Sequence, residues 1–183
     1  MKCTYLNRGT AHDETHMTDS EPIVLLTTGG TIDKAYFDKL SEYQIGETAV
    51  AKLLAIANVT HPYRVVEFLR KDSLDMTDAD RASLRQQVES LDTSRVVITH
   101  GTDTMTDSAK VLAGVRGKTI VLTGALSPAR FSESDAAFNL GMAFAVAQTA
   151  NAGVYITMNG QVFRGNEVQK DRSASRFVRI ASS

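Results

Sequence analysis

Short runs of apolar, often β-branched residues recur along the chain and are separated by longer stretches with helical spacing. Within each run the apolar residues are continuous rather than alternating with polar ones, which is typical of strands buried on both faces. The runs predict five strands, at residues 23–27, 65–68, 96–99, 119–123 and 154–158.

The stretches between these runs carry apolar residues three or four positions apart, as on one face of a helix. They predict helices at 47–57, 78–91, 107–115 and 135–150, and Thr77 is the expected N-cap of the second. Strands that alternate with helices indicate an α/β fold with a doubly wound, mostly parallel sheet of the Rossmann or flavodoxin-like type.

Glycine and threonine cluster where three of the predicted strands end, at residues 27–31, 99–104 and 123–125. Open α/β sheets bind ligands beyond the carboxyl ends of their strands. Glycines there let the backbone approach a ligand closely, and threonines place hydroxyl groups at the same edge. The plainer interpretation is that these residues simply end strands and start helices well. The occurrence of more than one such cluster, with the acid Asp103 in the cluster at 99–104, favours a ligand-binding or catalytic site instead.

A threonine hydroxyl is a weak nucleophile until a base or a lysine–acid pair activates it. No serine–histidine–aspartate set is evident, and His100, beside a strand end, is typical of a structural histidine. The sequence has neither the glycine-rich phosphate loop with its Gly-Lys-Ser/Thr end nor a G-x-G-x-x-G turn after the first strand. A nucleotide site is therefore poorly supported, and no cofactor is expected.

The bulk composition is that of a soluble globular domain, with 43% apolar and 22% charged residues and a formal net charge of −1. No basic stripe favours nucleic acid, and no apolar run of about 18 residues favours a membrane span. Cys3 is the single cysteine, so an internal disulfide is excluded. We expect a cytoplasmic protein.

The first 20 residues are polar and lack a periodic apolar pattern, which predicts a flexible N-terminal extension before a single domain at 21–183. Met17 is an alternative start. His12 and His16 have a spacing found in metal sites, but no third ligand accompanies them, and we expect no metal.

Two clusters resemble signatures of the bacterial-type L-asparaginases. Residues 28–32, Thr-Gly-Gly-Thr-Ile, resemble the first signature, and residues 100–105, His-Gly-Thr-Asp-Thr-Met, resemble the second. Two signatures in the right order are a specific match, and the similarity runs from about residue 22 to 178. It continues through residues 43–46, 72–76, 124–128, 135–140 and 158–160, then Gly165 and Lys170.

The resemblance implies two catalytic sets. Thr31 would attack the amide carbon and form an acyl-enzyme, assisted by Tyr43 on a mobile lid. Thr102, Asp103 and Lys170 would form a second set that orients substrate and water. A lysine buried beside a carboxylate could act there as a base. The motifs leave open which threonine attacks first, and Thr31 ranks ahead of Thr102.

The resemblance also implies how substrate is held. Ser73, with backbone near Asp72, would bind the α-carboxylate, and Asp103 would bind the α-amino group. Ala125 would accept a hydrogen bond from the leaving amide through its carbonyl. Backbone N–H groups near Thr31 and Thr102 would form the oxyanion hole.

Two departures from the family pattern matter. Leu74 stands where many members carry a polar residue that helps to bind the α-amino group. Typical members also add a smaller C-terminal domain, which supplies an acid to a neighbouring subunit's site, whereas this sequence ends 13 residues after Lys170. It resembles the short, single-domain members. We expect a homodimer or homotetramer, with weak hydrolysis of glutamine.

Asparagine hydrolysis to aspartate and ammonia is the function that the resemblance implies. Two alternatives remain from the sequence. One is the amidase component of a tRNA-dependent amidotransferase, which would need a partner subunit. The other is an amino-acid sensor or inactive relative, against which the retained Thr31, Tyr43, Thr102, Asp103 and Lys170 argue.

Overall fold

A computed structural model of the chain describes residues 20–37, 42–46 and 48–180. Its centre is a six-stranded sheet in the order β4-β1-β5-β6-β7-β8, parallel except for the last pair. The predicted class, a mostly parallel α/β sheet, is confirmed. The strands are β1 (Ile23–Gly29), β4 (Tyr63–Lys71), β5 (Arg95–Thr99), β6 (Thr119–Thr123), β7 (Gly153–Met158) and β8 (Gln161–Arg164).

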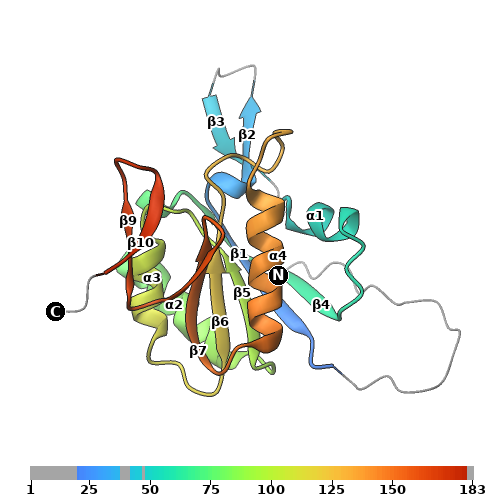
Figure 1. Cartoon of the computed structure of the whole chain (residues 1–183), viewed down its shortest axis with the longest axis vertical. Helices are drawn as coiled ribbons and strands as arrows, with labels where there is room; N and C mark the ends of the chain where they lie inside the picture. The colour runs from blue at the N-terminus through green and yellow to red at the C-terminus, as the bar shows by residue number, and fades with distance from the viewer. Residues whose placement is uncertain (1–19, 38–41, 47, 181–183) are drawn as a thin grey trace, which may run out of the picture.

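Helices cover both faces of this sheet, α1 and α4 on one and α2 and α3 on the other (Figure 1). Strand β1 explains the continuous apolar pattern. Ile23 and Leu25 pack into the cluster under α1 and α4, whereas Val24 and Leu26 pack into the cluster under α2 and α3. Each such side chain contributes about 1.5–3 kcal/mol through burial. The helices are α1 (Val50–Ile56), α2 (Asp78–Ser90), α3 (Met105–Leu112) and α4 (Ala136–Thr149).

The predicted strands and helices all form, with boundaries that differ by a few residues. Thr77 caps α2 as expected, in a capping box in which its hydroxyl accepts from the Asp80 amide and Asp80 accepts in return. Strand β4 extends to Lys71 and is only partly buried, because it lies at the edge of the sheet.

Three features were not predicted from the pattern. These are strand β8 and two antiparallel hairpins, whose short strands are rich in polar and charged residues. The hairpin strands are β2 (Lys34–Phe37) with β3 (Glu42–Ile45), and β9 (Val168–Asp171) with β10 (Arg176–Arg179).

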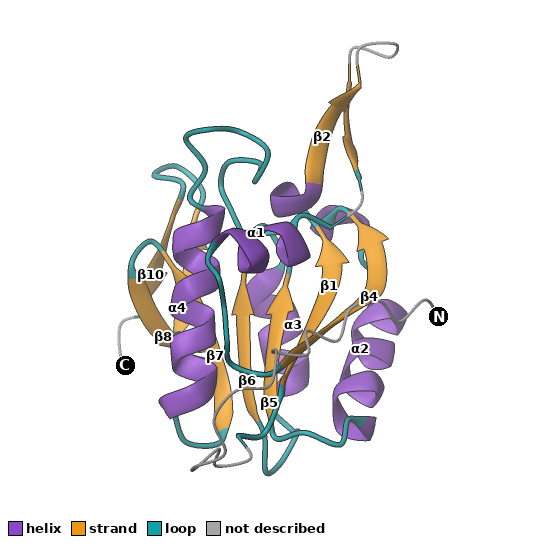
Figure 2. Ribbon diagram, turned by 90° about the vertical axis from the view of Figure 1, so that its right-hand side faces the viewer, coloured by secondary structure: helices purple, strands orange, loops and turns teal. Residues whose placement is uncertain are grey.

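The order of the strands switches sides at β1: β4, the next strand of the sheet along the chain, pairs in parallel on one side of β1, and β5 pairs in parallel on the other. Loops that leave these strands therefore diverge at their carboxyl ends, which is where doubly wound sheets bind ligands. The β2–β3 hairpin projects from the same edge (Figure 2). This edge holds the predicted site residues.

Residues 1–19 of the predicted N-terminal extension, including Cys3, His12 and His16, lie outside the described residues. At the start of the described chain, Glu21 accepts hydrogen bonds from the Ser94 amide and hydroxyl. Within the described part of the chain, no helix is both long enough and apolar enough to cross a membrane.

Candidate active site

The loops after β1, β4 and β5 touch one another at two glycines. A Cβ built on Gly30 would lie 2.5 Å from the Gly101 Cα, and one built on Gly101 would lie 2.5 Å from the Ser73 Oγ. Gly30 also has a φ of 87°, a conformation that favours glycine. The contact therefore requires both glycines, and it gathers the segments that carry Thr31, Ser73 and Thr102.

Three of the predicted catalytic residues form a hydrogen-bonded set. The Lys170 Nζ donates to the Thr102 Oγ1 at 2.7 Å and to the Asp103 Oδ1 at 2.9 Å. Thr102 is buried, and the Lys170 side chain is 13% exposed, against 37% for Asp103. Water therefore reaches the carboxylate more easily than the hydroxyl and the amine.

Lys170 reaches this position from β9, far along the chain from Thr102. Val168, two residues earlier and hence on the same face of the strand, is buried in the central core. Phe177, the residue paired with Lys170 across the hairpin, is buried in that core as well. These two apolar anchors fix the hairpin and turn Lys170 inward.

Thr31 begins a 3-10 turn directly after β1 and is partly exposed. Among the described residues, none forms a hydrogen bond with its hydroxyl. The turn itself is well held, because the Ile32 carbonyl accepts from the Ala129 amide and the Asp33 carbonyl accepts from the Gly46 amide. Within the described part of the chain, Thr31 therefore combines an unpaired hydroxyl with a fixed backbone.

Asp33 strengthens that turn with its side chain. Its Oδ1 accepts from the Ala49 amide at 2.9 Å, just before α1, and the residue is 2% exposed. Burial raises the pKa of this carboxyl above its usual value, although the hydrogen bond from Ala49 opposes the shift. Asp33 ties the Thr31 turn and the base of the β2–β3 hairpin to α1.

Tyr43 lies in β3, where its backbone is in register with Tyr36 of β2. The prediction concerned its side chain, which lies outside the described part of the structure. Its approach to Thr31 therefore stays a prediction.

Ser73 is 1% exposed, and its Oγ has no hydrogen-bond partner among the described residues. Its carbonyl accepts from the Thr104 hydroxyl at 2.7 Å, which joins its turn to the start of α3. A buried hydroxyl without a partner is uncommon and unfavourable. The Ser73 Oγ lies beside Gly101, the residue before Thr102.

Both carboxylate oxygens of Asp72 are engaged within the chain. Its Oδ1 accepts from the Leu74 amide at 3.1 Å, and its Oδ2 lies 2.8 Å from the Lys34 Nζ. Burial alone would raise the pKa of Asp72, but the hydrogen bonds from Lys34 and Leu74 hold it below the usual value. Asp72 thus shapes the Ser73 turn. Lys34, which no sequence pattern indicated as a site residue, links that turn to β2, the strand after Thr31.

Ala125 is buried and packs with Ile32 and Ala136, which brings the loop after β6 beside the Thr31 turn. The neighbouring Gly124 carbonyl accepts from the Asn139 side chain at 3.0 Å. Leu74, the apolar departure from the family pattern, is 66% exposed.

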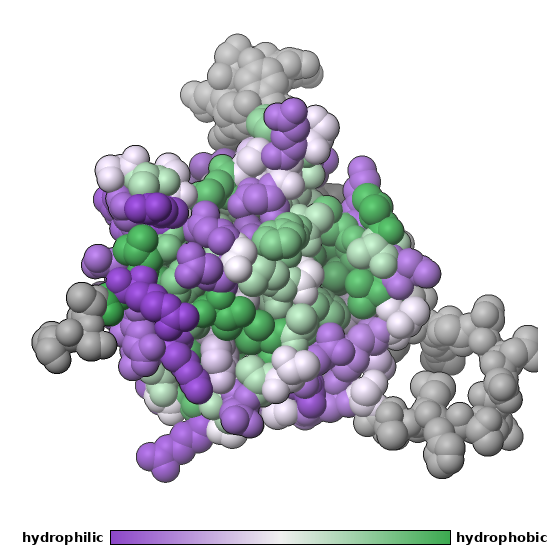
Figure 3. Space-filling view, in the orientation of Figure 1, coloured by the Kyte–Doolittle hydropathy of each residue, from purple (hydrophilic) through white to green (hydrophobic). Residues whose placement is uncertain are grey.

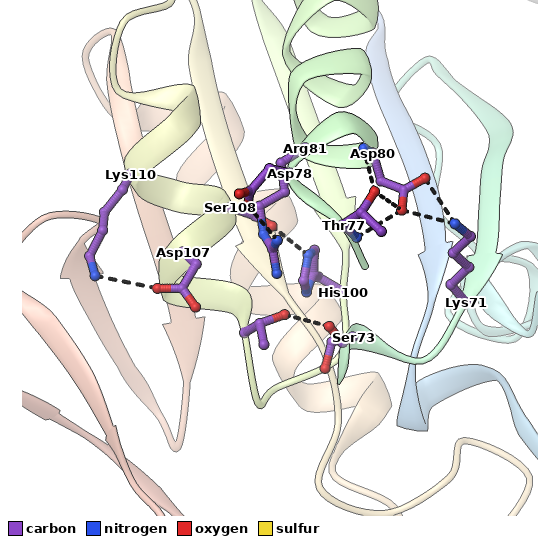
Figure 4. A network of polar contacts seen from close by, with 11 residues as sticks. Lys71, Ser73, Thr77, Asp78, Asp80, Arg81, His100, Asp107, Ser108 and Lys110 are labelled. Carbon is purple, nitrogen blue, oxygen red and sulfur yellow. Dashed lines mark hydrogen bonds and ion pairs between the residues drawn. The ribbon is translucent and has the colours of Figure 1, made fainter. Parts of the chain in front are cut away.

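His100 is buried behind the site, where it contacts Ser108 (Figure 4). Its Nδ1 lies 2.8 Å from the Gly101 carbonyl and its Nε2 lies 2.8 Å from the Ser108 hydroxyl. A carbonyl can only accept, so Nδ1 carries the proton and Nε2 accepts from Ser108. Burial lowers the pKa of His100 to about 4, so the ring is neutral at pH 7. It fixes the Gly101–Thr102 peptide and hence the direction of the Thr102 N–H.

The residues just described hold no obvious metal site. Within the described part of the chain, no group of three or more His, Cys, Asp or Glu residues could hold a metal ion. The chemistry on offer is that of hydroxyls, an amine, a carboxylate and backbone amides.

Comparison with known proteins places this arrangement in a family. Residues 22–178 match the family model "Asparaginase, N-terminal". The glutaminase-asparaginase of Acinetobacter glutaminasificans is 33% identical over 166 residues, which cover 81% of this chain and 49% of that protein. A component of the glutamyl-tRNA(Gln) amidotransferase of Methanococcus vannielii is 31% identical over 149 residues, covering 76% of this chain and 34% of that protein.

A solved structure agrees with these matches. The thermostable L-asparaginase from Thermococcus kodakarensis superposes with a TM-score of 0.77 at 25% identity, covering 88% of this chain and 52% of that one. The chain spans about half the length, or less, of these relatives. The chain belongs to the asparaginase family, and it corresponds to the family's N-terminal domain.

Proposed function

We propose that the chain hydrolyses the side-chain amide of L-asparagine to aspartate and ammonia through a threonine acyl-enzyme. The observation that carries the proposal is the Thr102–Lys170–Asp103 set, whose contacts of 2.7 and 2.9 Å lie next to the glycine contact that brings in the Thr31 turn. A hydroxyl held by a lysine–acid pair is a known way to prepare acyl transfer.

In the first half of the reaction, the Thr31 Oγ1 attacks the amide carbon, and its proton passes to the departing nitrogen with the help of Tyr43. The C–N bond breaks, ammonia leaves, and the aspartyl group remains on Thr31 as an ester. In the second half, a water molecule attacks that ester, which releases aspartate and returns the proton to Thr31. Backbone N–H groups near Thr31 and Thr102 stabilise the oxyanion in both halves.

Thr31 is the preferred nucleophile because its hydroxyl has no hydrogen-bond partner among the described residues, whereas the hydroxyl of Thr102 already accepts from Lys170. Thr102 and Lys170 then orient the substrate and the hydrolytic water, and Asp103 binds the α-amino group. The buried Ser73 hydroxyl, which has no partner among the described residues, binds the α-carboxylate in a turn shaped by Asp72. The Ala125 carbonyl accepts from the leaving amide.

Glutamine is expected to be a weaker substrate, since exposed, apolar Leu74 offers the α-amino group no polar contact. A site that holds this group loosely positions a longer side chain less well. We further propose a cytoplasmic homodimer or homotetramer. The single cysteine fits a reducing compartment.

The test is ammonia release by the pure protein from asparagine, glutamine and simple amides, with binding of each amino acid followed by calorimetry. Release that is fastest from asparagine supports the proposal. Binding of asparagine without release would overturn it in favour of a sensor. Release that needs a second protein and a charged tRNA would overturn it in favour of the amidotransferase role suggested by the Methanococcus vannielii relative.

A further inference from the structure

Asp33 is an ionisable side chain in an apolar setting, and the reaction proposed above gives it no part. The residue is 2% exposed, and both its neighbour Ile32 and the first residue of α1, Val50, are fully buried. Apolar residues also dominate the surface over α1 and α4 (Figure 3). A carboxylate in such a setting is unfavourable unless specific donors stabilise it. The donors that surround Asp33 therefore indicate what holds it there.

These donors belong to the segment that leads into α1. The Asp33 Oδ1 accepts from the Ala49 amide at 2.9 Å, although the two residues are 16 positions apart in the sequence. The Thr48 hydroxyl is a second donor. Ala49 is the N-cap residue of α1 and has no side chain that could accept a hydrogen bond. Asp33 therefore stabilises the start of this helix from another part of the chain.

The backbone of Asp33 joins the two ends of the β2–β3 hairpin. Asp33 directly precedes β2, and its carbonyl accepts at 2.9 Å from the amide of Gly46, which directly follows β3. Its own amide donates to the Gly30 carbonyl at 3.1 Å and so closes the turn around Thr31. One residue thus connects the Thr31 turn, the base of the hairpin and the start of α1.

The negative charge of Asp33 goes beyond what holding the helix requires. Asparagine or serine caps a helix about as well as aspartate and brings no charge into the interior. Burial is the strongest influence on Asp33 and raises its pKa above the usual value, and Glu67 of β4 acts in the same direction. The donors Ala49 and Thr48, together with Arg130 after β6, favour the charged form. A charged acceptor binds an amide more tightly than a neutral one, which is what the charge adds.

We propose that Asp33 is a positioning residue for Thr31: its carboxylate, bound to the start of α1, keeps the Thr31 turn in the position that the reaction needs. Protonation of Asp33 weakens the hydrogen bond from Ala49, the turn loosens, and the Thr31 hydroxyl reaches its attacking position less often. Asp33 acts through the backbone of the turn rather than by contact with the substrate. The inference rests on the proposed role of Thr31 and adds the residue that holds it.

Activity and stability should respond to the protonation of Asp33 in opposite directions. Because burial raises the pKa of Asp33 in the folded chain, the folded chain binds this proton more readily than the unfolded one. The resulting contribution to stability is complete below the usual pKa of 3.8 and is lost as the pH rises through the folded pKa. Activity is complete above the folded pKa and falls as Asp33 becomes protonated. A residue that only stabilised the fold would not produce these opposite trends.

Two substitutions near Asp33 test the proposal without altering the carboxylate, through the fall of kcat for asparagine at acidic pH. Thr48→Val removes a donor and should raise the pKa of Asp33, so kcat should fall at a higher pH than in the wild type. Glu67→Gln removes a like charge and should move the fall to a lower pH. Glu89→Gln, on the exposed side of α2, is the matched control and should leave it in place. A wild-type kcat without this fall, or a fall that neither variant moves, would overturn the proposal.

Asp33→Asn keeps an oxygen that can accept from Ala49 but removes the charge. We expect kcat to fall by about tenfold while KM stays within about twofold, because the turn is positioned less well. The urea midpoint at pH 7 should not fall, since a buried charge has been removed. Asp92→Asn, an exposed change of the same kind, is the control and should alter neither quantity. A normal kcat, or a loss of kcat that only follows a loss of stability, would contradict the positioning role.

Hydrogen exchange separates this inference from the proposed function. The Gly46 and Ala49 amides, which bond to Asp33, should lose protection in Asp33→Asn, and in the wild type as the pH falls through the pKa of Asp33. A wild-type chain that releases no ammonia would contradict the proposed function and leave this readout intact. Unchanged protection of both amides would overturn the positioning role, whatever the rate of ammonia release.

Discussion

The two threonines of the site are held in different ways. Thr102 is buried and already bonded to Lys170, which the core anchors through the β9–β10 hairpin. Thr31 is partly exposed, and its hydroxyl has no partner among the described residues, although its backbone is fixed by Asp33 and its neighbours. The fold thus joins Thr102, Asp103 and Lys170 before any substrate binds. The Thr31 hydroxyl, after β1, has no such contact among the described residues.

Among substitutions of the residues that surround the two threonines, the largest effect is expected from breaking the assembled set. Lys170→Met removes the amine from Thr102 and Asp103, and we expect kcat for asparagine to fall by about 10²–10⁴-fold, the usual worth of a positioned proton-transfer group. KM should change much less. Lys110→Met is the control, since that exposed lysine pairs with Asp107 on the same helix, and it should keep activity within about twofold. A Lys170→Met enzyme within a few-fold of normal would contradict a catalytic role for the set.

Ser73→Ala should affect binding more than chemistry. A hydrogen bond to a charged group contributes about 1.5–3 kcal/mol, so KM for asparagine should rise by about 10- to 100-fold. Steady-state kinetics would show this, with the exposed Ser83→Ala as the matched control. An unchanged KM would mean that the free Ser73 hydroxyl serves something other than the substrate carboxylate.

The buried His100, directly after β5, makes the free energy of unfolding of the chain depend on pH. Burial lowers its pKa from 6.5 to about 4, so the unfolded chain binds this proton more readily than the folded one. The stability that this neutral histidine allows is complete above pH 6.5 and is lost as the pH falls toward 4. The urea midpoint should therefore drop over that range, and His100→Asn should flatten the drop. Equal slopes for both proteins would contradict the assignment.

The smallest effect is expected at the link between the two sides. Lys34→Met breaks a partly exposed ion pair with Asp72, worth at most about 1 kcal/mol, so KM should rise by only about two- to fivefold. Exchanging the charges, with Lys34→Asp and Asp72→Lys together, should recover part of this loss of affinity. Lys52→Met, which changes an exposed lysine of α1, is the control and should leave KM unchanged. A loss as large as the one expected for Lys170→Met would contradict the distinction between the hydrogen-bonded Thr102 set and the Thr31 turn.

The fold could be predicted because its signals are local. Each buried parallel strand is a continuous apolar run, and the Thr77 cap is readable within four residues. The two glycine-rich turns could be located for the same reason. The polar hairpin that carries Lys170 has no such run. Val168 and Phe177, the residues that bury it against the core, lie in different strands among polar neighbours, so no local apolar pattern marks either strand.

The contacts within the site depend on the fold as a whole. The pairs Lys34–Asp72 and His100–Ser108 join residues whose meeting no local pattern encodes, and the buried state of Asp33 is visible only once α1 is in place. The sequence named the hydroxyls, the acid and the lysine through resemblance, and the structure adds which of them are already joined.

The most direct test of the proposed threonine mechanism is the rate of ammonia release from asparagine by the wild-type chain, Thr31→Ala and Thr102→Ala, measured side by side. We expect release by the wild type and a loss of at least about 10³-fold in each variant, because the two hydroxyls perform separate, necessary steps. Thr31→Ala with wild-type activity, or a wild-type chain that binds asparagine without releasing ammonia, would contradict it.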